Sequence, residues 1–461
     1  MRKTLIVAGA ALASAALVLP SNAASKAPAA RFGAPVRVTP PNGGGYEPTV
    51  VADRFGNLYA TAHKENAELV VSPDERSQTA TRSMSWAWWS RDNGATWQNL
   101  PLGPGDAYNK EFGDEGDMDV DEAGNVYFVD TTVADITFTQ WHTTGRGETQ
   151  FVRSTPLAGF GEPVDDRPWV VAHGDGHVFY FGNEGDSGTY PAGAAQGRPG
   201  SGYGPGRYTV YSSYDHGNTW DPIGYQLKGS GWCRPAADHR KGSKYLYAVC
   251  GNDGGADAVE QAAGVNIPAK GTLYAYVSAD DGKTFERYTI GSYNGADPWA
   301  TYPTVQVAKD GSIWAAYVDH AGTESPPKAG TVTLYHSTDH GKHWSKQAIT
   351  PQAGNYRYGW LSVAPNGNLG FAVYYRKDKK QPWRVYGAVW KPGQRPVLTS
   401  LDEKNPVASA DSSSPPGDFL TSYFTPDNKL NAVWTRNVLL VGAPPTASAY
   451  VYRDIYFARQ R

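Results

Sequence analysis

Seven segments of the chain share one pattern, and this repeat constrains the fold more than any other feature. Each segment carries an apolar run into a turn rich in Gly, Asn or Asp, and most continue into a second apolar or aromatic run. Two such runs joined by such a turn predict a β-hairpin. The segments are EPTVVADRFGN from Glu47, EGDMDVDEAGN from Glu115, RPWVVAHGDGH from Arg167, RPAADHRKGSK from Arg234, YPTVQVAKDGS from Tyr302, YGWLSVAPNGN from Tyr358 and DFLTSYFTPDN from Asp418. Seven copies of one hairpin indicate a repeat fold.

A third aromatic run follows each hairpin, and in four repeats a short box comes next. The box reads Ser-x-Asp-x-Gly-x-(Thr/His)-aromatic: SRDNGATW from Ser90, SYDHGNTW from Ser213, SADDGKTF from Ser278 and STDHGKHW from Ser337. Four antiparallel strands, repeated seven times at roughly 50–70 residues, predict an all-β fold: a single β-propeller with seven four-stranded blades. The chain ends on a third strand, so residues 34–40 should supply the missing fourth strand and close the ring.

The residue types of the box suit a turn. An Asp side chain can accept backbone N–H groups within its own turn, and Gly tolerates a positive φ angle. Because strands alternate in direction, these turns lie on the face opposite to the one where the first strands begin. We therefore interpret the box aspartates as structural rather than catalytic: Asp92, Asp215, Asp280 and Asp339.

The four boxes on a predicted propeller resemble those of the sialidase superfamily, also called BNR-repeat or Asp-box proteins, along nearly the whole chain. Sialidases have six blades, so a six-bladed fold is the alternative to the seven counted here. The superfamily includes sialidases, other glycoside hydrolases, polysaccharide lyases and non-catalytic proteins. In sialidases, three arginines hold the substrate carboxylate, an Asp is the acid/base and a Tyr–Glu pair is the nucleophile. Their Phe/Tyr-Arg-Ile-Pro motif is absent here, where the first repeat reads Tyr46-Glu47-Pro48.

The first position of every aligned segment is Glu, Asp, Arg or Tyr. A shared register would place these side chains at one height around the axis, where they would form a charged ring. Such a gathering of charge in a concave site is a common mark of function. We expect the catalytic groups among Glu47, Glu115, Asp418, Tyr302 and Tyr358.

Arginines can grip a carboxylate through paired hydrogen bonds. Arg167 and Arg234 are the ring members of this kind, and Arg376 or Arg436, at the ends of second strands, could supply a third. The resemblance and the ring together predict a sialidase-like glycoside hydrolase that acts on a glycan containing sialic or uronic acid. A polysaccharide lyase, with Tyr302 or Tyr358 abstracting the α-proton of a uronate, is one alternative. A non-catalytic propeller that binds a glycan or a protein is the other.

The N-terminal residues and the composition indicate where the protein acts and which kinds of partner it lacks. Residues 1–24 have two cations, an apolar run and small residues, which predict a secretory signal peptide and an exported propeller domain over residues 25–461. No other long apolar stretch predicts a membrane span, and a net charge of −3 without a basic run argues against nucleic acid. We expect a monomer without a cofactor. We also expect no metal site, because no His/Cys group has the spacing of zinc ligands.

The chain has two cysteines, Cys233 and Cys250, which flank the hairpin of the fourth segment. A hairpin centred between them would place the two side chains opposite each other on neighbouring strands. In an oxidising compartment, this arrangement predicts a structural disulfide.

Overall fold

The computed structural model describes residues 25–40, 43–66, 85–102, 115–131, 136–157, 168–184, 207–227, 230–252, 270–294, 303–319, 330–412, 414–417, 419–439 and 451–461. The predicted signal peptide lies outside the described residues, and so do three of the predicted site residues, Arg167, Tyr302 and Asp418. The backbone of Glu115 is described, but its side chain is not.

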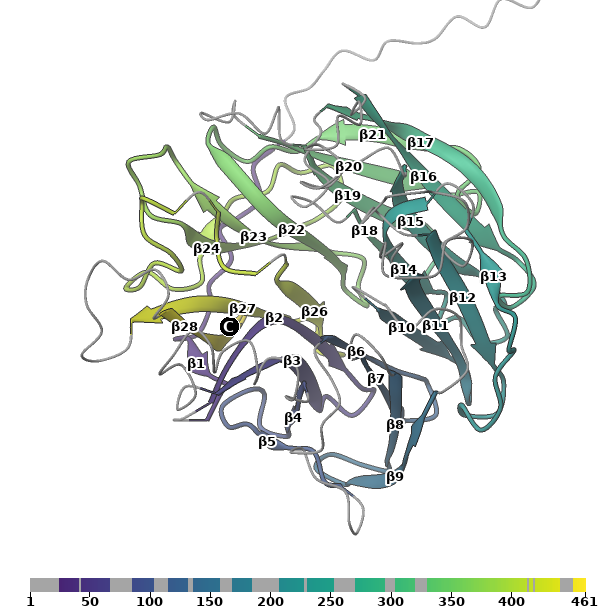
Figure 1. Cartoon of the computed structure of the whole chain (residues 1–461). Coiled ribbons are helices and arrows are strands. Elements are labelled where there is room, and N and C mark those ends of the chain that lie inside the picture. The colour runs from purple at the N-terminus through teal and green to yellow at the C-terminus, as the bar shows by residue number, and fades with distance from the viewer. Residues whose placement is uncertain are drawn as a thin grey trace, which may run out of the picture.

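The seven predicted blades are confirmed: seven four-stranded antiparallel sheets stand around a common axis (Figure 1). Blades 1 to 3 contain β2 (Gly43–Ala52), β3 (Leu58–Asn66), β4 (Trp86–Ser90) and β5 (Gln98–Asn99); β6 (Glu115–Val120), β7 (Asn125–Thr131), β8 (Ile136–Thr143) and β9 (Thr149–Pro156); and β10 (Trp169–His173), β11 (His177–Glu184), β12 (Arg207–Ser213) and β13 (Tyr225–Gln226).

Blades 4 to 6 contain β14 (Ser230–Ala237), β15 (Leu246–Asn252), β16 (Lys270–Ser278) and β17 (Glu286–Asn294); β18 (Thr304–Val307), β19 (Ile313–Asp319), β20 (Thr331–Ser337) and β21 (Ser345–Ala348); and β22 (Asn355–Val363), β23 (Leu369–Arg376), β24 (Arg384–Trp390) and β25 (Thr399–Ser400). Blade 7 contains β26 (Thr421–Phe424), β27 (Leu430–Leu439), β28 (Val451–Arg459) and β1 (Val36–Arg37). Within the described residues, no helix is long and apolar enough to cross a membrane.

The first strand of the chain closes the ring, as the sequence predicts. The purple strand β1 lies beside the yellow strand β28 in Figure 1, and Val36 pairs with Phe457. The guanidinium of Arg37 donates a 2.7 Å hydrogen bond to Asp454, and the Thr39 hydroxyl donates a second bond of 2.8 Å to the same oxygen. Both ends of the described chain are thus joined in one sheet, which leaves no blade with an unpaired third strand.

The blades pack face to face through apolar side chains. Between blades 5 and 6, for example, Val318 and Leu334 pack in one buried cluster with Leu361 and Phe371. The innermost strand of every blade starts on one face of the disc, called here the entry face. The first hairpin turns and the box turns lie on the other, called the turn face. This alternation follows from the antiparallel order of the strands.

All four boxes form the same hydrogen-bonded turn on the turn face. In the first box, Ser90 donates to Asp92 and accepts the Gly94 N–H, while Asp92 accepts both the N–H and the hydroxyl of Thr96. The φ angle of Gly94 is +84°, and a Cβ atom there would lie 1.9 Å from the Phe457 ring of the preceding blade. Glycine is therefore required both for the backbone conformation and for the close approach of two blades.

Replacing Asp92 by alanine should lower the free energy of unfolding by about 1–2 kcal/mol, because the turn loses several hydrogen bonds. Burial alone would raise the pKa of Asp92, but its bonds from Thr96 and Ser90 hold that pKa below its ordinary value, so the carboxylate is the form that the turn prefers. Urea denaturation measures this loss. A variant as stable as the parent would contradict the structural role.

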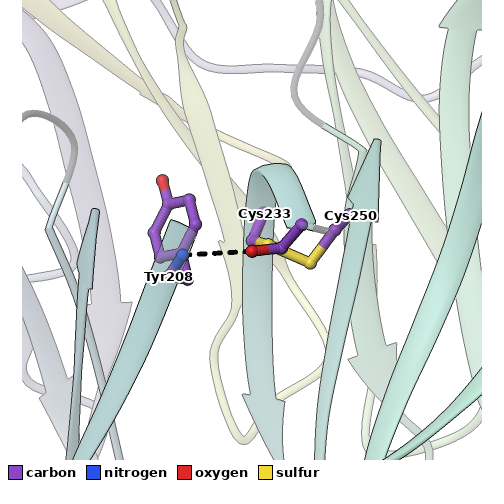
Figure 2. Close-up of a disulfide and its surroundings, with 4 residues drawn as sticks. Tyr208, Cys233 and Cys250 are labelled. Carbon is purple, nitrogen blue, oxygen red and sulfur yellow. Dashed lines mark hydrogen bonds between the residues drawn. A yellow bond between two sulfur atoms is a disulfide. The ribbon is translucent and has the colours of Figure 1, made fainter. Parts of the chain in front are cut away.

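The predicted disulfide is confirmed. Cys233 on β14 and Cys250 on β15 are directly opposed in the strand register, and their sulfur atoms are bonded (Figure 2). Both residues are fully buried beside Tyr208 of blade 3, whose N–H donates a 3.0 Å hydrogen bond to Ser230 on the same strand as Cys233. The bridge thus fixes the innermost hairpin of blade 4 at the interface with blade 3.

Replacing Cys233 and Cys250 together by serine should lower the free energy of unfolding by about 3 kcal/mol, because the bridge closes a loop of 17 residues in the unfolded chain. Chemical denaturation with and without reductant measures the effect. Reductant should destabilise the parent and leave the double variant unchanged. Two reactive thiols in the unfolded, unreduced parent would instead show that the bridge does not form.

Candidate functional site

The strand register corrects the predicted ring in two blades. In blade 1, Glu47 lies five residues before Ala52, the last paired residue of the innermost strand. The turn of blade 4 is longer, and the last pair there joins Ala237 to Leu246, so the residue equivalent to Glu47 is Trp232. Arg234 therefore lies two residues deeper than the alignment placed it.

Blade 7 needs a similar correction, by one residue. Its last pair joins Phe424 to Leu430, so Phe419 takes the place equivalent to Glu47, and Asp418 precedes it. The alignment failed in both blades because it was anchored on turn residues, and turns vary in length while the strand pairs do not. In blades 1, 2 and 6, where the ring residue is described, the register places Glu47, Glu115 and Tyr358 at equivalent positions.

Two residues below the ring, one side chain from each innermost strand contributes to a layer that we call the axial layer. Its members are Thr49, Asp117, Trp169, Arg234, Thr304, Trp360 and Thr421, and every one is buried. Trp169 and Trp360 lie 6.1 Å apart between ring centroids, although they belong to blades 3 and 6. Phe419 packs against both, at 5.5 and 6.2 Å. These aromatic rings close the axis of the propeller.

Arg234 is the charged centre of this layer. Its guanidinium lies over the rings of Trp169 and Trp360, at 4.3 and 4.8 Å from their centroids. Its Nη1 donates a 3.0 Å hydrogen bond to Asp117, which also accepts the N–H of Val170. Burial raises the pKa of Asp117, and the Arg234 charge opposes that rise. The predicted carboxylate-binding arginine is thus already neutralised by a carboxylate of the protein.

A small cavity continues from the axial layer towards the turn face. Arg234 and Trp360 line it together with Asp119, Gln306 and Tyr423. Burial raises the pKa of Asp119 to about 6, although a nearby imidazolium and a backbone N–H oppose the shift. The cavity volume of about 30 Å³ accommodates about two water molecules and is too small for a sugar.

Glu47 is held in an unusual backbone conformation. Its φ angle is +55°, and it lies at a β-bulge between the pairs Tyr46–His63 and Thr49–Thr61. A left-handed residue that is not glycine costs free energy, and such strain concentrates at functional sites, as do bulges. The Glu47 Oε2 atom lies 3.3 Å from His63 Nε2, and both side chains are buried. The fold thus places an acid and an imidazole in contact.

Neighbouring blades fix this pair in position. The N–H of Glu47 donates to the Thr435 hydroxyl at 3.1 Å, and the Thr435 N–H donates to the Tyr374 hydroxyl at 3.0 Å. Burial raises the pKa of Tyr374, its bonds to Thr435 oppose the rise, and the Glu47 carboxylate adds to it. Tyr374 therefore stays a neutral phenol and, being fully buried, positions Glu47 rather than reacting itself.

Tyr46 and Arg453 extend the pair towards solvent. The ring of Tyr46 packs on His63 with centroids 4.1 Å apart, and the Arg453 guanidinium lies 3.6 Å from the Tyr46 centroid. Both Tyr46 and Arg453 are partly exposed. Tyr46, Glu47, His63 and Arg453 together combine a carboxyl group in contact with an imidazole, an aromatic ring and a cation. We call these four residues the Glu47 cluster.

The remaining predicted residues have separate places. Tyr358 occupies the equivalent bulge of blade 6, with a φ angle of +53°, and packs edge-on against Tyr374. The guanidinium of Arg376 lies over Trp383 and donates to the carbonyls of residues 410 and 412, and burial lowers its pKa. Arg436 lies over Tyr456 and within 3.4 Å of Asp402. The two arginines therefore tie loops and blades together, and neither reaches the Glu47 cluster through a described contact.

Sequence reasoning missed His63, Arg453 and Asp117. His63 and Arg453 lie on second and third strands, so an alignment of first strands could not reach them. The signal for His63 was its strand partner, because the hairpin pairs it with Tyr46, next to Glu47. Asp117 lies two residues after Glu115 on the same innermost strand, so an alignment that compared only first positions did not select it.

No protein-family model matches the chain, and no curated protein does. Among solved structures, a fungal alcohol oxidase of the AA5 family in complex with copper aligns with a TM-score of 0.50 and 11% identity, over 93% of this chain and 76% of that chain. A protein of unknown function from Dyadobacter fermentans aligns with a TM-score of 0.49 and 13% identity, over 94% and 100%. A polysaccharide lyase described as an ulvan lyase aligns with a TM-score of 0.47 and 10% identity, over 93% of each chain. The alignment with the alcohol oxidase, at this low identity, indicates similarity of fold and not of activity.

Proposed function

We propose that the protein is an exported enzyme that cleaves an anionic glycan at the entry face, with the Glu47 cluster as its catalytic centre. The observation that carries this proposal is the strained, buried Glu47, whose carboxylate lies 3.3 Å from His63. A carboxyl group and an imidazole in contact can pass a proton between them and so serve a reacting bond as acid or base. Export rests on the predicted signal peptide and accords with the disulfide.

The other two members of the cluster suit a sugar acid. Tyr46 is partly exposed, and the part of its ring that His63 and Arg453 leave open could contact the apolar face of a sugar ring. The guanidinium of Arg453 can donate two parallel hydrogen bonds to a carboxylate. We assign to Arg453 the role that the sequence assigned to Arg234, because Arg453 is partly exposed whereas Arg234 is buried in the axial layer.

The first candidate reaction is glycoside hydrolysis. Glu47 would protonate the leaving oxygen of the glycosidic bond, and the proton that the attacking water releases would restore Glu47 by way of His63. A second carboxyl group would activate water or form the glycosyl intermediate. The predicted ring members Glu115 and Asp418 remain candidates for that second group. Sialic acid and uronic acids both carry the carboxylate that Arg453 would bind.

The second candidate is a polysaccharide lyase, and one observation favours it. The Glu47 cluster combines one carboxyl group with an imidazole and a cation. Elimination from a uronate needs a base for the α-proton and a cation near the carboxylate, and it needs no second carboxyl group. His63 would serve as the base and Arg453 as the cation, and Glu47 would protonate the glycosidic oxygen as it leaves.

Product analysis on sialosides, uronate polysaccharides and neutral glycans tests the proposal. A hydrolase releases new reducing ends without ultraviolet absorbance, whereas a lyase leaves an unsaturated uronate that absorbs. Either product from an acidic glycan, reduced by Arg453→Ala, supports the proposal. If glycans bind without any product, the protein is the non-catalytic binding propeller, and the proposed function is wrong.

A further inference from the structure

On the turn face, far along the chain from the Glu47 cluster, two histidines and an aspartate converge between blades 3 and 4. His173 Nε2 lies 2.9 Å from Asp281 Oδ1, and His177 Nδ1 lies 2.8 Å from Asp281 Oδ2. One ligand atom from each of the three residues lies within 4.8 Å of the others. We propose that His173, His177 and Asp281 bind a divalent first-row metal ion, with zinc as the ion that their chemistry fits best.

In blade 3, the two histidines replace an Asp–Asn pair that closes the first hairpin turn in blades 1 and 2. In blade 1, the first hairpin turn is closed by a 2.7 Å hydrogen bond from the side chain of Asn57 to Asp53, and blade 2 repeats this bond. The corresponding positions of blade 3 hold His173 and His177, which pair across the strand register. Both imidazoles face the next blade, so blade 3 has exchanged a bond within the turn for contacts with Asp281.

Asp281 also departs from its equivalents. It follows the box aspartate of blade 4 and has a φ angle of +67°. The same left-handed position holds Asn93, His216 and His340 in the other boxes. Asp281 is thus the acidic member of the four, and it is the one that faces two imidazoles. Its own carbonyl accepts a 2.7 Å hydrogen bond from the Tyr214 hydroxyl, which holds the turn in place.

The donor set and its geometry suit zinc. Imidazole nitrogen and carboxylate oxygen are ordinary zinc ligands, at about 2.0–2.2 Å from the ion. His177 Nδ1 is buried, and no well-aligned hydrogen bond satisfies it although Asp281 is near. A small rotation of the Asp281 side chain would separate its carboxylate from the two imidazoles, so that all three ligand atoms could surround one ion. The side chain of His177 is 36% exposed, so solvent could provide a fourth ligand.

A second cluster of similar composition is less suited. Asp121, Asp175 and His216 also lie within reach of one another. However, Asp121 already accepts the N–H groups of Gly124, Asn125 and Gly176. A metal would have to displace these bonds, whereas at the His173 site it replaces two contacts to one carboxylate. This second cluster supplies the matched control.

Zinc binding by untagged protein, treated with chelator and dialysed into metal-free buffer, tests the proposal. Titration calorimetry gives affinity and stoichiometry, and the visible spectrum of bound Co²⁺ reports the ligand type. The variants are His177→Ala and Asp281→Asn. The second introduces the residue type of Asn93, which occupies the equivalent position in blade 1. The control is His216→Asn, which makes the same residue at the equivalent position one blade earlier. Circular dichroism without metal establishes that each variant folds.

We expect the parent to bind one zinc ion per chain, and His177→Ala and Asp281→Asn to bind it at least about tenfold more weakly. His216→Asn should bind like the parent. Zinc should also raise the melting temperature of the parent and of the control more than that of the two site variants, because the ion binds the folded state alone. Absence of zinc binding by the parent would overturn the proposal, and so would loss of binding in His216→Asn with both site variants unaffected.

Discussion

Replacing Glu47 by glutamine should reduce turnover of the natural glycan by about a hundredfold to ten-thousandfold, the usual contribution of a positioned acid or base. The amide keeps the size of the side chain, and the N–H bond of residue 47 to Thr435 is unaffected. It removes the exchangeable proton beside His63, so the chemical step fails while the site keeps its shape. We therefore expect kcat to fall with little change in the binding of intact substrate, measured by steady-state kinetics and by titration calorimetry.

The matched control is Glu122→Gln. Glu122 also contacts a histidine, with 2.6 Å between its Oε1 atom and His239 Nδ1, but this pair lies on the turn face. The turnover of the Glu122→Gln variant should equal that of the parent. If both variants lose activity equally, general destabilisation explains the loss. If neither does, Glu47 is not the acid or base.

Replacing Arg234 by alanine should lower the free energy of unfolding by about 3–5 kcal/mol, because it leaves the buried Asp117 carboxylate without its cation. The side chain also fills space over Trp169 and Trp360, and that packing is lost as well. The loss should be larger at pH 8 than at pH 5. Burial already raises the pKa of Asp117, and without Arg234 that pKa rises further, so protonation relieves the penalty at low pH.

A double variant separates the charge from the packing. Arg234→Met with Asp117→Asn removes both charges and leaves an amide oxygen for the N–H of Val170. It should be more stable than Arg234→Ala, since a buried pair replaced as a unit costs little. Denaturant titration of the three proteins at both pH values gives the comparison. A fully stable Arg234→Ala that loses only its use of acidic glycans would instead restore Arg234 as a substrate-binding residue.

The architecture was accessible from the sequence because each blade repeats local rules. A turn with Gly or Asn between apolar runs makes a hairpin wherever it occurs, and the box makes its turn by contacts within a few residues. The same locality allowed the disulfide to be predicted, since the opposed register of Cys233 and Cys250 follows from one hairpin. Closure by residues 34–40 followed from counting strands, because the last blade otherwise had three strands where the other blades have four.

The site was less accessible, because it depends on distances between blades. The longer turn of blade 4 moved Arg234 into the axial layer, where Asp117 of blade 2 meets it. The bulge at Glu47 involves a left-handed residue that is not glycine, and local preference argues against such a conformation. A hydrogen bond to Thr435 of blade 7 holds Glu47 in this conformation, and no pattern within the first repeat predicts that contact.

The proposed metal site could not be predicted from the sequence, for a related reason. A search for zinc spacing looks for ligands close together in the chain, and the pair His173 and His177 alone is too small a signal. The third ligand, Asp281, is 104 residues beyond His177 in the sequence and becomes a neighbour only when blade 4 packs on blade 3. Arg453 was missed in the same way, because it meets Tyr46 only when the last blade closes on the first.

The most direct measurement of the central claim is a crystal structure of the Glu47→Gln variant with an intact oligosaccharide of the glycan that the parent cleaves. We predict that the sugar packs on Tyr46, that its carboxylate contacts Arg453, and that its glycosidic oxygen lies within hydrogen-bond reach of the residue 47 side chain. An oligosaccharide bound on the turn face, or on the entry face without contact to residue 47, would contradict the account.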